Sequence, residues 1–281
     1  MTDTATLTLS RPNRTGIVRA VTGHLAEHGC DIVEHQQFDD AVRRRRFLRT
    51  QFAGEPAGGL AAVAGDFAPI AETFGMEHAF HPRRPPRVVM VSTLGHCRGD
   101  LIYRWRAGGL SAELVAVVSN HTDPRPMAEA AGLPFVHLPV TPTTKAAAEA
   151  DLLGLVDRFD VELVVLARYM QILSDDLCAV LRGRAITIHR SFLPGFKGAK
   201  PYHQAYDRGV KLVGATAHYV TADLDEGPII EQEVIRIDHT HDPRALQTVG
   251  RDAEALALSR AVRWHCERRV LIDGHSTVVF R

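Results

Sequence analysis

His189 and Asp225 are the two side chains whose types and positions could do chemistry together. His189 ends an apolar, β-branched run that begins at Ala185, and Asp225 lies in a loop-type segment at residues 223–228. In a doubly wound α/β sheet the carboxyl end of a strand opens onto the ligand crevice. A histidine and a carboxylate at that edge can share a proton or orient one water molecule. The spacing therefore favours an acid/base pair.

Each of the two residues also has a plainer interpretation. A histidine after a strand is more often a structural loop residue, and an aspartate in a polar segment is more often a turn or cap residue. The chain between them favours chemistry: a loop broken by Pro194 and Gly198, a helix that begins at Tyr202, and a strand over residues 213–220. This order predicts that the second loop lies at the same sheet edge as His189.

The common cofactor motifs are absent from the sequence. No G-x-G-x-x-G, G-x-x-x-x-G-K-[ST], H-E-x-x-H or G-x-S-x-G pattern occurs, so no dinucleotide, P-loop, zincin or nucleophile-elbow site is indicated. His239 and His241 form a His-x-His pair without further ligands in range, which is typical of a polar turn. We therefore expect neither a metal nor a resident cofactor.

The composition excludes several classes of protein. The 33 Lys and Arg residues balance the 33 Asp and Glu residues, so no global charge indicates a nucleic acid or an anionic membrane as partner. The four cysteines form no C-x-x-C pair and are interpreted as ordinary thiols in a reducing compartment. The chain has no export signal and no run of about 18 apolar residues, so we expect a cytoplasmic location.

The first 82 residues follow the order β-α-β-β-α-β, which is typical of a ferredoxin-like domain. The expected elements are a strand at 4–10, a helix at 17–28, strands at 32–38 and 47–52, a helix at 56–74 and a strand at 76–80. Residues 83–86 are a proline-rich, basic linker, and we place the domain boundary there.

Residues 87–281 alternate strands and helices, as in a Rossmann-like domain with a mostly parallel sheet. Strands are expected at 87–92, 114–119, 163–167, 185–189, 212–220 and 229–237, and helices at 97–108, 124–131, 143–158, 174–181 and 243–267. Residues 270–279 are expected to form a hairpin.

Long stretches of the chain, in order, resemble one family, formyltetrahydrofolate deformylase, over nearly the whole length. The matching stretches are 29–40, 100–106, 117–121, 168–174, 191–194, 198–206, 214–220 and 224–230. The resemblance implies an N-terminal ACT domain of residues 1–82 and a formyltransferase-type catalytic domain of residues 87–281. It also implies hydrolysis of 10-formyltetrahydrofolate to formate and tetrahydrofolate, with the folate as substrate, and a homodimer or homotetramer.

The family's functional positions carry over to particular residues of this chain. The catalytic histidine and aspartate correspond to His189 and Asp225, and Thr187 stands where the family's N-I-H pattern has asparagine. The resemblance places the folate-binding residues at Met170, Gln171, Ile172, Leu173, Asp223 and Leu224. An amino-acid effector would lie at Asn13, Gly16 and Ile17, where the family's D-R-P-G-I-V reads Asn-Arg-Thr-Gly-Ile-Val.

Thr187 leaves three hypotheses open. In the first, water attacks the formyl group and the threonine hydroxyl replaces the asparagine amide as a hydrogen-bond donor. In the second, the chain is a folate-dependent formyltransferase, or a related one-carbon enzyme, with an amine acceptor. In the third, it binds a folate or an amino acid without turnover. Release of formate without an acceptor separates the first two hypotheses, and folate binding without turnover identifies the third.

Overall fold

The computed structural model describes residues 4–195 and 201–281, and the chain divides into two compact units. The first unit extends to Arg84 and takes in Arg268–Asp273 and Val278–Arg281, and the second comprises Pro85–Glu267 and Gly274–Thr277. The division thus falls inside the predicted 83–86 linker. Residues 198–200 of the family resemblance, and Gly198 of the predicted loop, lie outside the described residues.

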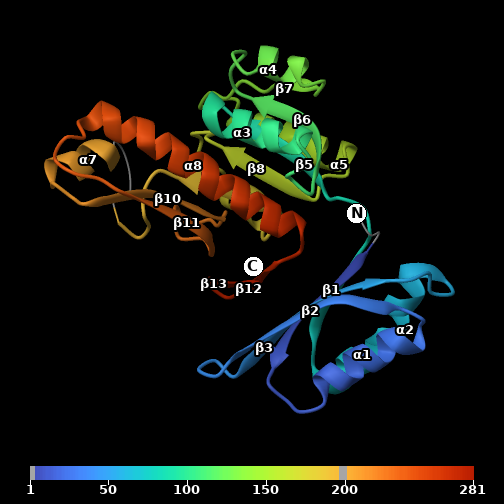
Figure 1. The fold of residues 1–281 in the computed structure, drawn as a ribbon. Helices are drawn as coiled ribbons and strands as arrows, with labels where there is room; N and C mark the ends of the chain where they lie inside the picture. The colour runs from blue at the N-terminus through green and yellow to red at the C-terminus, as the bar shows by residue number, and fades with distance from the viewer. Residues whose placement is uncertain (1–3, 196–200) are drawn as a thin grey trace. The chain divides into compact units, whose positions relative to one another are not determined.

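The first unit has the predicted β-α-β-β-α-β order. Its elements are β1 (Ala5–Pro12), α1 (Ile17–Glu27), β2 (Asp31–Asp40), β3 (Arg45–Ala53), α2 (Gly59–Phe74) and β4 (Glu77–His81). The strands form an antiparallel sheet in the order β2-β3-β1-β4 (Figure 1). Leu25 of α1 and Phe67 of α2 pack into one apolar core with Leu7 of β1, which is why the helices carry apolar residues at helical spacing.

The C-terminal hairpin consists of β12 (Val270–Asp273) and β13 (Ser276–Val279). The sequence predicted the hairpin within a catalytic domain of residues 87–281. Leu271 and Phe280 instead pack against Phe47 of β3, within the first unit. Arg269 also lies 3.5 Å from the carboxylate of Glu34 on β2. Contacts of such long range leave no periodic signal in the sequence.

The second unit is built on a seven-stranded sheet in the order β11-β10-β9-β8-β5-β6-β7. Its strands are β5 (Arg87–Ser92), β6 (Glu113–Ser119), β7 (Phe135–His137), β8 (Leu163–Ala167), β9 (Ala185–His189), β10 (Leu212–Tyr219) and β11 (Ile229–Arg236). Strands β5 to β9 pair in parallel, and β10 runs antiparallel to both β9 and β11. The mostly parallel sheet is confirmed, and the three-residue β7 is too short to have shown a pattern in the sequence.

The helices of this unit cover the buried strands β5, β6 and β8, whose apolar runs are typical of a parallel sheet covered on both faces (Figure 1). They are α3 (Gly95–Arg106), α4 (Arg125–Ala130), α5 (Lys145–Arg158), α6 (Asp175–Val180), α7 (Pro201–Asp207) and α8 (Pro243–Cys266). The side chain of Asp242 accepts a hydrogen bond from the Ala245 backbone N–H and so fixes the start of α8. Among the helices in the described ranges, none has the length and hydropathy needed to cross a membrane.

Candidate active site

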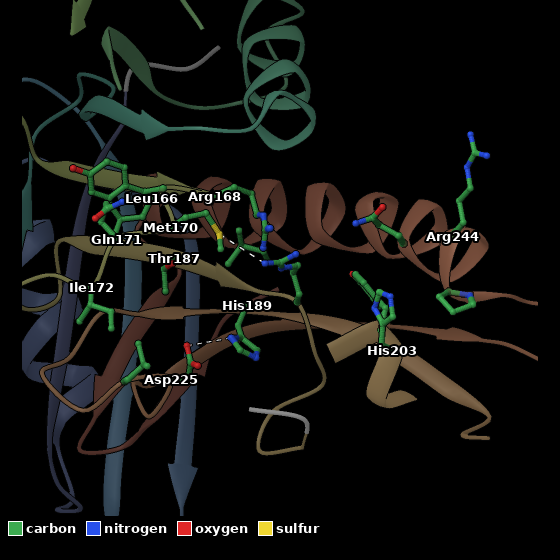
Figure 2. Close-up of a pocket in the computed structure, with 17 residues that line it drawn as sticks. Leu166, Arg168, Met170, Gln171, Ile172, Thr187, His189, His203, Asp225 and Arg244 are labelled. Atoms are coloured by element: carbon green, nitrogen blue, oxygen red, sulfur yellow. Dashed lines mark hydrogen bonds and ion pairs between the residues drawn. The ribbon is translucent and has the colours of Figure 1, made fainter. Parts of the chain in front are cut away.

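A cavity of about 790 Å³ lies at the carboxyl ends of β8 and β9, bounded on one side by the start of α8 (Figure 2). Its volume is within the range of small-molecule sites. Thr187, His189 and Asp225 all line it, so the structure brings the three predicted catalytic residues together. A smaller cavity of about 80 Å³ adjoins it and shares Thr187 and Asp225.

The register of β9 and β10 determines which side chains face the cavity. Thr187 and His189 are two residues apart on β9 and therefore lie on the same face. Thr187 pairs with His218 of β10, and His189 pairs with Thr216. The Thr216 hydroxyl donates to the Ser191 carbonyl at 2.8 Å and thereby ties the chain just after His189 to β10.

Asp225 reaches the site by a different route from the one predicted. Because β10 is antiparallel to β9, the loop after β10 leaves beside Ala185, the first residue of β9, where the Val220 N–H donates to its carbonyl. The predicted common sheet edge is therefore wrong. The loop instead folds back over the strands. A side chain at Gly227 would come within 1.7 Å of the Tyr219 carbonyl oxygen, and Asp225 adopts a left-handed φ of 60°.

The loop brings Asp225 between two histidines. Its Oδ1 lies 3.1 Å from His189 Nδ1 and 3.9 Å from His218 Nε2. His218 Nδ1 lies 2.9 Å from the Tyr219 carbonyl oxygen, which can only accept, so Nδ1 carries the proton. Burial lowers the pKa of His218, against the opposing effects of the Tyr219 hydrogen bond and the Asp225 charge. His218 is therefore neutral, and its Nε2 is an acceptor aimed near the carboxylate.

His218 is a site residue that the sequence did not single out, although it lies within one of the matching stretches. The available sequence signal was a strand in which small residues alternate with polar ones, so that His218 lies on the same face as Thr216. Only the strand register shows that it faces Thr187.

The Thr187 side chain faces both cavities, and its hydroxyl makes no hydrogen bond with any other residue that the structure describes (Figure 2). An oxygen that is free of protein partners can donate to a ligand. The threonine therefore supplies a donor on the same face as His189.

The predicted folate-binding residues form an apolar rim and a smaller recess. Met170, Ile172 and Leu224 line the main cavity and are 57%, 63% and 60% exposed, which is unusual for large apolar side chains and typical of a ligand surface. Gln171 lines both cavities. Leu173 belongs to the buried core and, like Asp223, lines only the smaller cavity.

A buried charge cluster stands behind the cavity wall. Glu254 of α8 is 1% exposed; its carboxylate accepts from the Tyr202 hydroxyl at 2.9 Å and pairs with His96 Nε2 at 2.8 Å. Arg168 Nε lies 3.3 Å from the same carboxylate. The sequence analysis did not predict this cluster, whose members come from β8, α3, α7 and α8 or the adjoining loops.

The same cluster has a spacing that could hold a metal ion. The ligand atoms of His96, Cys97 and Glu254 lie within 4.8 Å of one another. However, the carboxylate already accepts from the Tyr202 hydroxyl and is paired with His96 and with the guanidinium of Arg168. Burial raises the pKa of the Cys97 thiol far above its usual range, so the sulfur is not a thiolate. These groups fit an internal ion-pair network better than a cation site.

The predicted effector residues lie in the first unit, around the start of α1. Gly16 has a φ of 94° and borders a shallow depression of about 470 Å³. The Asn13 N–H donates to the Arg44 carbonyl, and its side chain is exposed. Ile17 is fully buried, so only its backbone could face an effector.

The chain is similar to known proteins over nearly all of its length. Residues 87–262 match the Formyl transferase family. The chain is 52% identical to a formyltetrahydrofolate deformylase of Corynebacterium sp. (strain P-1), covering 98% of this chain and 97% of the relative. It is 44% identical to the deformylase of Bacillus subtilis (strain 168), covering 99% and 94%. A crystal structure of the Burkholderia mallei deformylase superposes with a TM-score of 0.92 at 51% identity, covering 99% of this chain and 100% of that one. Fold, cavity and sequence agree, and the chain belongs to the formyltetrahydrofolate deformylase family of enzymes.

Proposed function

We propose that this protein hydrolyses 10-formyltetrahydrofolate to formate and tetrahydrofolate at the His189–Asp225 pair. The observation that supports the proposal is the contact between Asp225 Oδ1 and His189 Nδ1 at 3.1 Å, inside a cavity large enough for a folate. Family membership supports the reaction, and the geometry of the cavity supports the assignment of these two groups to it.

The first step is the activation of water by Asp225. The 3.9 Å between Asp225 Oδ1 and His218 Nε2 is too long for a hydrogen bond and suits one bridging water molecule. That water would donate to both acceptors and direct a lone pair at the formyl carbon. Asp225 takes its proton as the oxygen–carbon bond forms.

His189 and Thr187 act on the oxygen of the formyl group. We propose that His189 donates from Nδ1 to Asp225 and, as an imidazolium during the reaction, from Nε2 to the developing oxyanion. The Thr187 hydroxyl is the second donor. The proton that Asp225 took then passes to N10 as the bond between the formyl carbon and N10 breaks, and the formic acid released loses its own proton to water and leaves as formate. Every proton in this scheme moves between water, the folate and side chains of the chain, so we propose no metal or resident cofactor.

The pteridine end of the folate is proposed to lie against Met170, Ile172 and Leu224. Contact with a flat, largely apolar ring would cover surface that these side chains leave open to solvent. Gln171, Leu173 and Asp223 would contact the same end through the adjoining recess.

The reaction is tested with 10-formyltetrahydrofolate and heavy-oxygen water, with no amine added. We expect formate and tetrahydrofolate in equal amounts, with one heavy oxygen in each formate, because the attacking oxygen comes from water. His189→Asn should lose this turnover. His239→Asn, which changes an exposed histidine outside the cavity, should keep it.

A folate that stays formylated, in an assay where it binds, would overturn the hydrolase. If formyl groups were transferred only after an amine was added, the formyltransferase hypothesis would replace it. Binding without turnover under either condition would identify a folate-binding homologue.

For the ACT-like domain we propose a homodimer or homotetramer and an amino-acid effector near Gly16. The edge strand β2 exposes Val33 and Phe38, and the depression beside α1 provides a place for a small ligand. Sedimentation equilibrium with and without a mixture of free amino acids tests both. The four cysteines are buried thiols outside any disulfide, which supports a reducing compartment, the cytoplasm.

A further inference from the structure

The wall of the main cavity carries more positive than negative charge. Arg168, Arg190 and Arg244 line it, and Asp225 is the single carboxylate among its described lining residues. That carboxylate is already engaged by His189. A cavity of this kind favours an anionic ligand.

Arg168 presents hydrogen-bond donors at the cavity wall. The residue is 6% exposed, and its contact with Glu254 is through Nε at 3.3 Å. Nε is buried and makes no hydrogen bond within the described part of the chain, although it is ion-paired with Glu254. A guanidinium carries five N–H donors, so Arg168, which lines the cavity, has donors left for a ligand beyond its contact with Glu254.

Arg190 stands in the same cavity without an ion-pair partner among the described residues. Its recorded contact is with the Met170 sulfur at 3.9 Å, and a thioether is a weak acceptor. Burial lowers the pKa of Arg168, Glu254 acts against this, and the charge of Arg190 lowers it further. Two guanidinium groups thus face one space and repel each other until an anion lies between them.

We propose that Arg168 and Arg190 form an oxyanion subsite that binds a carboxylate of the molecule processed beside His189. Arg168 is held in place by Glu254, and Arg190 completes the pair. The proposal rests on the proposed function for the identity of the ligand. Under that function two carboxylates have the required chemistry: the glutamyl tail of the folate and the formate that hydrolysis releases.

Binding measured by calorimetry separates these two sources without any need for turnover. The probes are sodium formate, tetrahydrofolate, and tetrahydropteroate, which lacks the glutamate. Arg190→Gln should weaken binding of the carboxylate probe by about 10-fold to 100-fold, the usual contribution of a hydrogen bond to a charged group. The affinity of Arg190→Lys for this probe should lie between those of the wild type and Arg190→Gln, because lysine keeps the charge and loses the planar fork. Arg182→Gln, at an exposed arginine outside the cavity, is the matched control.

Each result has one consequence. Weaker binding of tetrahydrofolate with unchanged tetrahydropteroate assigns the subsite to the glutamyl tail. Weaker formate binding with both pterins unchanged assigns it to the product. Equal affinities of wild type and Arg190→Gln for all three probes would overturn the subsite. Arginine-dependent binding by a protein that releases no formate would leave the subsite standing and reject the hydrolase.

Discussion

Two of the histidine–carboxylate pairs in the second unit are similar in distance and differ in their surroundings. His96 and Glu254 are 2.8 Å apart, and His189 and Asp225 are 3.1 Å apart. Glu254 lies on a long helix, accepts from Tyr202, and is paired with His96 and Arg168. Asp225 sits on a loop with a left-handed backbone and borders a cavity.

The difference between the two pairs distinguishes a structural ion pair from one that can act on a ligand. Burial by itself would raise the pKa of Glu254, but the hydrogen bond from His96 and the charge of Arg168 hold that pKa below its usual value. A fully engaged carboxylate has no capacity left for water or substrate. Asp225 leaves room for one water toward His218, so only the second pair can act on a ligand.

The largest expected effect is that of Asp225→Asn on turnover. Loss of the base should lower kcat by about 10²-fold to 10⁴-fold. The amide can still accept from His189, so the free energy of unfolding should change by less than about 1 kcal/mol. Formate release and urea unfolding measure the two quantities. Asp151→Asn, at an exposed aspartate of α5, should change neither, and an active Asp225→Asn would remove Asp225 from the mechanism.

Glu254→Gln should show the reverse pattern. Removing this charge leaves the guanidinium of Arg168 buried without compensation, which costs about 3–5 kcal/mol of unfolding free energy. Turnover of the folded protein should fall much less than in Asp225→Asn. Urea unfolding provides the test, with Glu129→Gln as control, because the exposed Arg125–Glu129 pair is worth less than about 1 kcal/mol. A loss as small as the control's would show that the cluster is not structural.

Thr187→Val should lower kcat by about 10²-fold to 10³-fold, the usual effect of removing one oxyanion donor. The shape of the side chain is nearly kept, so binding of tetrahydrofolate should be little changed. Thr187→Asn, unlike Thr187→Val, should have a kcat equal to that of the wild type or higher, since the amide also donates. If Thr187→Val were fully active, the hydroxyl would have no part in the reaction.

Local patterns and the family resemblance together predicted several residues that line the cavity, but not how the chain brings them there. The apolar run before His189 and the polar segment around Asp225 made both residues candidates, and the family resemblance implied their roles. The antiparallel direction of β10 depends on pairing across the sheet, which no local pattern encodes, so the route of the second loop was predicted wrongly.

The buried cluster had a local signal that was not used. Glu254 follows Ala253 and precedes Ala257 and Leu258, all of them on the buried face of α8. A carboxylate within an apolar helical stripe predicts a buried partner. Which partner it meets, here His96 and Arg168, depends on packing between distant parts of the chain.

The smallest effect expected is a pH dependence that separates the two pairs. The folded state holds the pKa of His218 below the ordinary value of about 6.5, mainly through burial, while Asp225 and His189 act on it in opposite directions. The unfolded chain therefore binds more protons at His218, and this contribution to stability is complete above pH 6.5 and is lost as the pH falls through the folded pKa. The free energy of unfolding should fall between pH 7 and pH 5, by at most about 1.4 kcal/mol per pH unit from this group.

The kcat should also fall over this pH range, because a protonated Nε2 of His218 cannot accept a hydrogen bond from water. Urea unfolding across this range should give a flatter profile for His218→Gln and an unchanged one for His239→Asn. Parallel profiles for wild type and His218→Gln would show that His218 does not titrate there. The pKa of Glu254 is held below that of an ordinary glutamate. Through the same linkage, its contribution to the free energy of unfolding should be lost only at lower pH.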